Sequence, residues 1–206
     1  MPHLEPKSGK LLMTMFSSAG SAEFASPSPE PPADEAALVQ ATLAEDPRAF
    51  ETIVHLHHRR VFGFLHQFTR HQQDAEDLTQ QTFLKAYQSL HRFDCRRPLI
   101  NWLLTIARHN ALNHFRSARK WEEVPEQTAS AAPSPARSAE EKDLSENLWA
   151  RARRLLSPRE FEVLWLRFGE ELSIEETAKI AGLTQTHVKV LVYRARQQLL
   201  KGINPP

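Results

Sequence analysis

Apolar residues recur at steps of three and four along much of the chain, a spacing that predicts helices. The most regular run covers residues 99–120, and its predicted apolar face consists of Ile100, Leu103, Leu104, Ala107, Ala111 and Phe115. Pro98 stands directly before this run, where a helix can begin because the N–H that proline lacks would be unpaired there in any case. Few stretches alternate in the manner of a strand, so the sequence predicts an all-α protein.

Three further helices are predicted before this run. The first covers residues 34–44. The second begins at Pro47 and is so apolar that we expect it at the centre of a small bundle. The third covers residues 75–90, with Asp74 as its N-cap. Its predicted buried stripe consists of Phe83, Ala86, Tyr87 and Leu90.

Changes of composition divide the chain. Residues 1–33 are rich in Ser, Pro and Ala and lack periodicity, so we expect a disordered tail. Residues 122–138 are again rich in Ala, Ser and Pro and predict a flexible linker. We therefore expect two small helical domains, one over residues 34–121 and the other over residues 139–206.

The second domain carries the sequence signals of a helix-turn-helix. Capping boxes at residues 157–160 and 173–176 each open a helix, and Gly169 ends the first of these helices. Gly182 then turns the chain into a last helix that runs to about Lys201. This layout places the last helix in the major groove of DNA in many DNA-binding proteins. A plain helical hairpin is the alternative interpretation.

Charge is segregated along the chain, although the formal net charge is only +1, from 26 Lys and Arg against 25 Asp and Glu. Residues 95–120 contain six basic side chains and no acid, and residues 177–206 contain five basic side chains and no acid. Two basic blocks in a nearly neutral chain indicate two contacts with a polyanion such as nucleic acid. A solvated basic face on a core helix is the alternative for the first block.

Cysteine use and hydropathy bear on the compartment. Cys95 is the only cysteine, which argues against a disulfide framework and a cysteine-based metal site and fits a reducing cytoplasm. No run is long enough for membrane insertion, and the apolar centre of residues 10–16 is only about six residues long, shorter than that of a signal peptide. We therefore expect a cytoplasmic protein, with Met1, Met13 and Met15 as alternative start residues.

Histidines on or beside the second predicted helix suggest an enzymatic alternative, a metallohydrolase. They are His55, His57, His58, His66 and His71, with Glu51 on the helical face of His55 and His58. This spacing differs from the pair of histidines four residues apart on a zinc hydrolase helix. The sequence offers no convincing ligand set with a general base, so we expect no catalytic residue, no metal and no cofactor.

Two stretches carry a more specific signal. Their segments are DAEDLTQQTFLKAY at residues 74–87, RFD at 92–94, WLLTIARHN at 102–110, LSPRE at 156–160 and YRAR at 193–196. The first three segments resemble region 2, and the last two resemble region 4, of bacterial sigma factors of the extracytoplasmic-function (ECF) group. With the linker, the resemblance covers residues 34–201.

The resemblance implies a non-enzymatic initiation subunit of RNA polymerase. Region 2 would dock on the β′ coiled coil of core RNA polymerase through Asp77, Gln80, Gln81 and Lys85. It would also hold the opened −10 element of promoter DNA, whereas region 4 would sit on the β flap and read the −35 duplex. Many relatives are held by an anti-sigma factor, which is a further candidate partner.

Residue chemistry agrees with these two DNA contacts. Basic side chains hold phosphates, Asn pairs with base edges, and aromatic rings stack on extruded bases. The candidates for the −10 element are Arg96, Arg97, Asn101, Trp102, Arg108, Asn113, Arg116 and Lys120. The candidates for the −35 element are Thr184, Thr186, His187, Lys189, Val190, Tyr193, Arg194 and Arg196. The positions expected to face inward on the last helix are Val188, Val192, Ala195 and Leu199. For Trp102, a core position is an equal alternative.

The chain also departs from the family pattern. Gln81 stands where the family usually has Glu, and Tyr193 replaces a frequent His. Val190 and Leu191 stand where polar Ser and Arg are usual in the recognition helix, and the long Ser- and Pro-rich tail is unusual. A stand-alone helix-turn-helix regulator that binds duplex DNA without polymerase is the alternative function, because response regulators carry a similar C-terminal unit.

Overall fold

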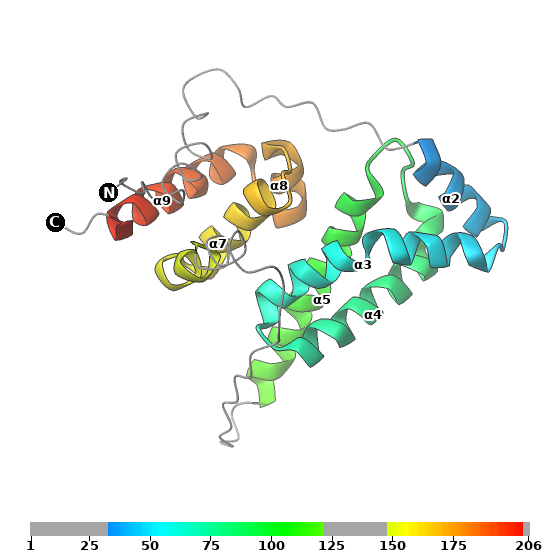
Figure 1. Ribbon diagram of the computed structural model, residues 1–206, viewed down its shortest axis with the longest axis horizontal. Helices are drawn as coiled ribbons and strands as arrows, with labels where there is room; N and C mark the ends of the chain where they lie inside the picture. The colour runs from blue at the N-terminus through cyan, green and yellow to red at the C-terminus, as the bar shows by residue number, and fades with distance from the viewer. Residues whose placement is uncertain (1–32, 122–147, 204–206) are drawn as a thin grey trace, which may run out of the picture. The chain divides into compact units, whose positions relative to one another are not determined.

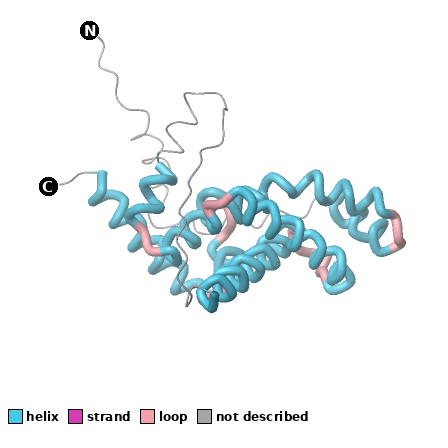
Figure 2. Tube along the Cα trace, turned by 90° about the horizontal axis from the view of Figure 1, so that it is seen from below, coloured by secondary structure: helices cyan, strands magenta, loops and turns pink. Residues whose placement is uncertain are grey.

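The computed structural model describes residues 33–121 and 148–203, which are helical apart from short connecting turns (Figures 1 and 2). These residues fall into two compact units. Neither described range contains a strand, which confirms the all-α prediction. The predicted linker, and all but the last residue of the predicted tail, lie outside the described residues.

The N-terminal unit is a small helical bundle. Its elements are α2 (Ala33–Leu43), α3 (Pro47–Thr69), α4 (Gln72–Ser89), the 3₁₀ turn η1 (Leu90–Arg92) and α5 (Leu99–Trp121). Helix α3 packs against α2, α4 and α5, so it has the central position that its apolar sequence predicts. The side chains of Ile53, Phe64 and Leu65 on α3 and of Leu103 and Leu104 on α5 are almost completely buried.

Local signals set both ends of α3. The side chain of Asp46 accepts a hydrogen bond from the backbone N–H of Arg48 at 3.0 Å, and Pro47 lies in the first turn as predicted. The helix stops at Arg70, whose left-handed conformation (φ 58°) lets its N–H bond to the carbonyl of His66. Two residues therefore suffice to connect α3 to α4.

The start of α4 differs from the prediction. The helix begins at Gln72 rather than at Ala75, and its N-cap is His71 rather than Asp74. The imidazole Nδ1 of His71 accepts the backbone N–H of Asp74 at 3.4 Å. Asp74 therefore lies inside the first turn, where a carboxylate still interacts favourably with the helix dipole.

Two aromatic residues expected in the core are exposed instead, namely Tyr87 (52%) and Phe115 (38%). The buried residues of α4 instead include Thr79 and Thr82, whose hydroxyls donate to the carbonyls of residues 75 and 78 at 2.6 and 2.7 Å. These intrahelical bonds satisfy the threonine hydroxyls, so polar side chains can replace aromatic ones in the core.

The C-terminal unit is built from short helices. Its elements are a helix over residues 148–155, α7 (Pro158–Leu164), the π-helical turn η2 (Trp165–Gly169), α8 (Ile174–Ala181) and α9 (Gln185–Ile203). Its buried cluster consists of Ala152, Leu156, Phe161, Leu164, Ala195 and Leu199. This cluster joins residues 148–156 and α7 to the middle and end of α9.

Both predicted capping boxes are present, at the starts of α7 and α8. The helix that begins at Pro158 ends at Gly169 as predicted, but its last turn is π-helical. Gly182 ends α8 in the left-handed conformation (φ 63°), and the N–H of Leu183 bonds to the carbonyl of Ala178 at 2.9 Å. This left-handed position favours glycine, because a residue with a Cβ atom typically loses roughly 1–2 kcal/mol there. Helix α9 then begins three residues after Gly182, completing the helix-turn-helix.

Candidate nucleic-acid interface

The first turn of α5 is fixed by a buried carboxylate from α2. Glu35 Oε2 accepts the backbone N–H of Leu99 at 3.2 Å, and Glu35 Oε1 lies 3.3 Å from His57 Nε2 on α3. Only 14% of the Glu35 side chain and 7% of the His57 side chain are exposed. The carboxylate thus satisfies an N–H at the positive end of the α5 dipole and joins three helices at one point.

Burial lowers the pKa of His57, and Arg60 lowers it further, while the charge of Glu35 opposes both effects. Since the unfolded chain keeps the ordinary value near 6.5, it binds a proton first as the pH falls. We expect the free energy of unfolding to decrease as the pH falls from about 6.5 to the lower pKa of folded His57. Urea unfolding of His57→Gln at several pH values should show a smaller loss over this interval than wild type. An equal loss in both proteins would contradict the assignment.

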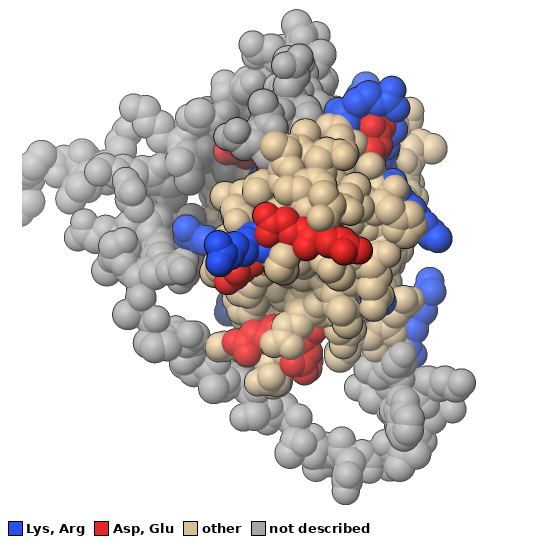
Figure 3. Space-filling model, turned by 90° about the vertical axis from the view of Figure 1, so that its right-hand side faces the viewer, with Lys and Arg blue, Asp and Glu red and all other residues tan. Residues whose placement is uncertain are grey.

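The loop before α5 places two predicted DNA contacts beside one acid. Arg96 donates its backbone N–H, Nε and Nη2 to the carboxylate of Asp94 at 3.2, 2.9 and 3.2 Å, and Arg97 Nε lies 3.6 Å from it. The side-chain hydrogen bond from Arg96 is the main cause of the lowered pKa of Asp94. The charge pattern does not point to this partner, because Asp94 lies one residue before the acid-free block. Figure 3 shows basic and acidic side chains similarly interspersed on one face of the molecule.

Replacing Asp94 by Asn should release both guanidinium groups for phosphate while keeping an oxygen that accepts the Arg96 N–H. We expect Asp94→Asn to bind a single-stranded oligodeoxynucleotide more tightly at 50 mM salt. The slope of log affinity against log salt should steepen by about 0.7, because removing one carboxylate leaves one more net positive charge to neutralise a phosphate. Fluorescence anisotropy over a salt series measures this slope. Glu51→Gln, which removes the same charge at an exposed site on α3, should leave it unchanged; an unchanged slope in Asp94→Asn would refute the prediction.

The predicted −10 residues of α5 and of the loop before it are only partly exposed. Arg96, Arg97, Asn113 and Arg116 are exposed, Asn101 is half-buried, and the Lys120 side chain lies outside the described residues. Arg108 is 6% exposed, which corrects its predicted position on the outer face. It follows Leu104 by four residues and precedes Ala111 by three, so it shares their buried stripe.

Trp102 packs against the same loop. Its ring is half-buried, with its centroid 5.3 Å from that of Phe93. This contact gives Trp102 a packing role in the structure, and its stacking on a base stays a prediction.

The predicted docking face of α4 is exposed at all four positions, Asp77, Gln80, Gln81 and Lys85. Lys85 Nζ also donates to Asn110 Oδ1 of α5 at 2.5 Å, and buried Asn110 donates to Thr82 Oγ1 at 3.0 Å. Sequence analysis missed Asn110, which ties the docking face to the helix that carries the −10 candidates.

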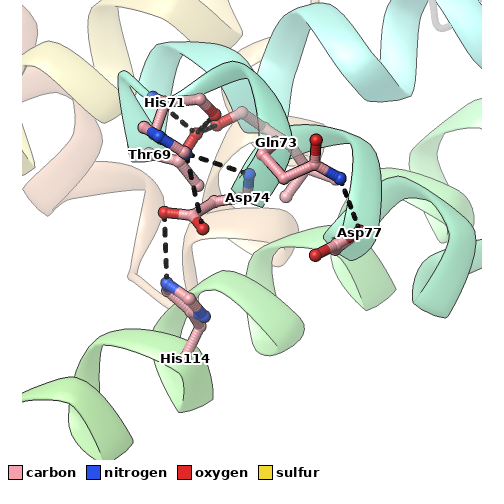
Figure 4. Close-up of polar contacts among 7 residues, drawn as sticks. Thr69, His71, Gln73, Asp74, Asp77 and His114 are labelled. Atoms are coloured by element: carbon pink, nitrogen blue, oxygen red, sulfur yellow. Dashed lines mark hydrogen bonds and ion pairs between the residues drawn. The ribbon is translucent and has the colours of Figure 1, made fainter. Parts of the chain in front are cut away.

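A second tie joins the start of α4 to α5 (Figure 4). The carboxylate of Asp74 lies 3.6 Å from His71 Nδ1 and 3.7 Å from His114 Nε2 of α5. His114 is next to Asn113 in the sequence. The contact with His114 is the one that reaches α5, and because it is partly exposed it contributes little to stability.

The outer face of α9 presents most of the predicted −35 residues. Thr186, His187, Lys189, Val190, Tyr193 and Arg194 are exposed, while Arg196 is half-buried. Val188, Ala195 and Leu199 are buried as predicted, Val192 is half-buried, and Leu191 joins the core. Thr184 Oγ1 accepts the N–H of His187 at 3.2 Å, so this candidate caps the helix.

Side chains of α7 position the helix-turn-helix. Arg159 donates Nη2 to the carbonyl of Ala181 at 2.9 Å, and its Nη1 contacts Glu162 at 2.8 Å. Glu160 accepts a hydrogen bond from Gln198 of α9 at 3.2 Å. The bonds to Ala181 and Gln198 hold the end of α8 and the side of α9, and no short-range sequence signal predicts them, because they join residues 22 and 38 positions apart.

A metal site finds no support among residues 33–121 and 148–203. No three His, Cys, Asp or Glu side chains there form a group that could hold a metal ion. Glu51 contacts His55 at 3.8 Å, whereas the ring of His58 stacks near Phe62 and Phe83. None of the described helices is long and apolar enough to span a membrane.

Two parts of the chain match family descriptions. Residues 53–121 match Sigma-70 region 2, and residues 154–201 match Sigma-70 region 4. The ECF RNA polymerase sigma factor BldN of Streptomyces coelicolor is 33% identical over 80% of this chain, which spans 64% of BldN, just under two thirds. The ECF RNA polymerase sigma factor SigC of Mycobacterium tuberculosis is 32% identical over 84% of this chain and 94% of its own length.

Solved structures agree in fold. CnrH, in complex with the cytosolic domain of CnrY, superposes with a TM-score of 0.61 at 23% identity, covering 82% of this chain and 97% of CnrH. The sigma factor RpoE of Bartonella quintana, in complex with the anti-sigma factor NepR, has a TM-score of 0.61 at 25% identity, covering 75% of this chain and 96% of RpoE. The chain belongs to the ECF group of the sigma-70 family, whose members are transcription initiation factors that bind DNA rather than catalysts.

Proposed function

We propose that this chain binds core RNA polymerase in the cytoplasm and directs it to a limited set of promoters as an alternative sigma factor. The observation that carries the proposal is the pairing of two helical units with separate basic segments. One segment includes the exposed Arg96, Arg97 and Arg116 of the N-terminal unit, and the other is on α9. Two such segments suit one upstream and one downstream contact with the same DNA.

The exposed surfaces of each unit support a proposed role for it. The exposed face of α4 docks on the β′ coiled coil, and the loop before α5 with the exposed end of α5 holds the opened −10 strand. The C-terminal unit sits on the β flap, and α9 reads the −35 duplex in the major groove. Basic side chains bind phosphates in both contacts, while polar and apolar groups meet the bases.

An inhibitor is a second proposed partner. CnrH and RpoE were both solved as complexes, with the cytosolic domain of CnrY and with the anti-sigma factor NepR. We expect an anti-sigma factor to compete with polymerase for the exposed faces of α4 and α9.

Assembly with polymerase separates this function from that of a stand-alone regulator. The purified chain should co-elute with core RNA polymerase in size-exclusion chromatography, and the assembled complex should bind promoter fragments more tightly than the free chain does. A regulator would instead bind duplex DNA equally well without polymerase. Failure to co-elute, together with specific binding by the free chain, would favour the regulator.

A further inference from the structure

Val190 is an aliphatic side chain on the exposed face of α9, three residues before the aromatic ring of Tyr193, which is 64% exposed. Val190 itself is 40% exposed, whereas the core positions Val188 and Leu191 are 0% and 6% exposed. Thr186 precedes Val190 by four residues and Arg194 follows it by four, so these exposed side chains form one stripe with it. Val190 therefore contributes to the outer surface of the recognition helix rather than to the folding core.

The chemistry of valine restricts what it can read. Its side chain offers neither a hydrogen-bond donor nor an acceptor, and branching at Cβ holds it mainly in one rotamer on a helix. Among the groups in the major groove, the C5 methyl of thymine is the one that an apolar side chain recognises. The five basic and no acidic residues of the segment 177–206 fit a DNA partner over an apolar protein surface.

We propose that Val190 contacts the C5 methyl of a thymine in the −35 element and makes that position thymine-specific. The inference rests on the proposed reading of duplex DNA by α9. Two apolar groups in contact exclude water. Cytosine would instead place its amino group against the valine, and that amino group would have no hydrogen-bond partner there. The apolar residue that departs from the family pattern thus becomes a determinant of promoter choice.

Deoxyuridine tests the contact because it lacks only the methyl group. The holoenzyme, which is core RNA polymerase with this chain bound, is first used to map the start sites of its promoters. A series of fragments of such a promoter is then made, each with a single thymine of the upstream element replaced by deoxyuridine. At one position, the substitution should weaken holoenzyme binding roughly fourfold, which is the effect of losing one buried methyl group. Val190→Ala should bind the deoxyuridine and thymine fragments with nearly equal affinity at that position.

Leu200→Ala supplies the matched control, since Leu200 is a comparably exposed apolar residue (43%) ten residues further along α9. This variant should keep the full effect of deoxyuridine. If no upstream deoxyuridine weakens binding of the wild-type holoenzyme, or if Val190→Ala keeps the same sensitivity, the contact is refuted. If the wild-type holoenzyme then still binds the promoter more tightly than a fragment with a scrambled upstream element, reading of the −35 element by α9 stays supported. If the wild-type holoenzyme binds both fragments equally, the proposed −35 role itself is overturned.

Discussion

Replacing Glu35 by Ala is expected to lower the free energy of unfolding of the N-terminal unit by about 2–3 kcal/mol. The substitution leaves the backbone N–H of Leu99 without its acceptor and removes the carboxylate beside His57. A buried backbone N–H that loses its acceptor costs roughly 1–3 kcal/mol, and loss of the carboxylate 3.3 Å from His57 Nε2 adds to this cost. Pulsed hydrogen exchange along a urea series measures the effect, because it follows α2 to α5 separately from α7 to α9.

Glu35→Gln isolates the hydrogen bond from the charge. Its amide oxygen can still accept the Leu99 N–H, so we expect a loss of about half that of Glu35→Ala. Glu51→Ala, which truncates an exposed carboxylate on α3, should change stability by less than about 0.5 kcal/mol. A loss in Glu35→Ala no larger than that in Glu51→Ala would show that α2 does not hold the start of α5.

Asp77→Arg is expected to weaken binding to core RNA polymerase at least tenfold. Asp77 is exposed on α4 and is the only acid among the four predicted docking residues. Reversing its charge sets a cation against the partner surface that an acid complements, which costs more than simple truncation. Titration of fluorescent core enzyme with each variant measures the dissociation constant.

The structure also offers a control for this charge reversal. Glu51→Arg makes the same change in net charge at an exposed position on α3, where the Glu51 carboxylate lies 3.8 Å from His55 Nε2. It should bind core enzyme like wild type if docking is confined to α4. Equal weakening by both variants would indicate a general charge effect, and no weakening by Asp77→Arg would remove Asp77 from the docking face.

Short-range signals predicted the helices well. Pro47, the capping boxes at Ser157 and Ser173, and Gly182 each act within four residues, so the sequence alone reveals their effect. The exposed face of α9 follows from the same helical periodicity.

Local signals and helical periodicity do not predict contacts between residues that are far apart in the sequence. Glu35 and Leu99 are 64 positions apart, and Lys85 and Asn110 are 25 apart, so neither pair follows from periodicity. Arg108 is buried although it is charged, because its spacing from Leu104 and Ala111 places it in the buried stripe. Packing of α5 against both α3 and α4 explains why that stripe is wider than the apolar residues suggest.

Transcription in vitro tests the central claim most directly. Core RNA polymerase, sheared DNA from the source organism and this chain would be incubated with nucleotides, and the 5′ ends of the transcripts mapped. The sigma-factor account predicts discrete start sites that appear only with the chain and share −10 and −35 elements. An unchanged set of start sites, obtained with a chain that binds duplex DNA without polymerase, would contradict it.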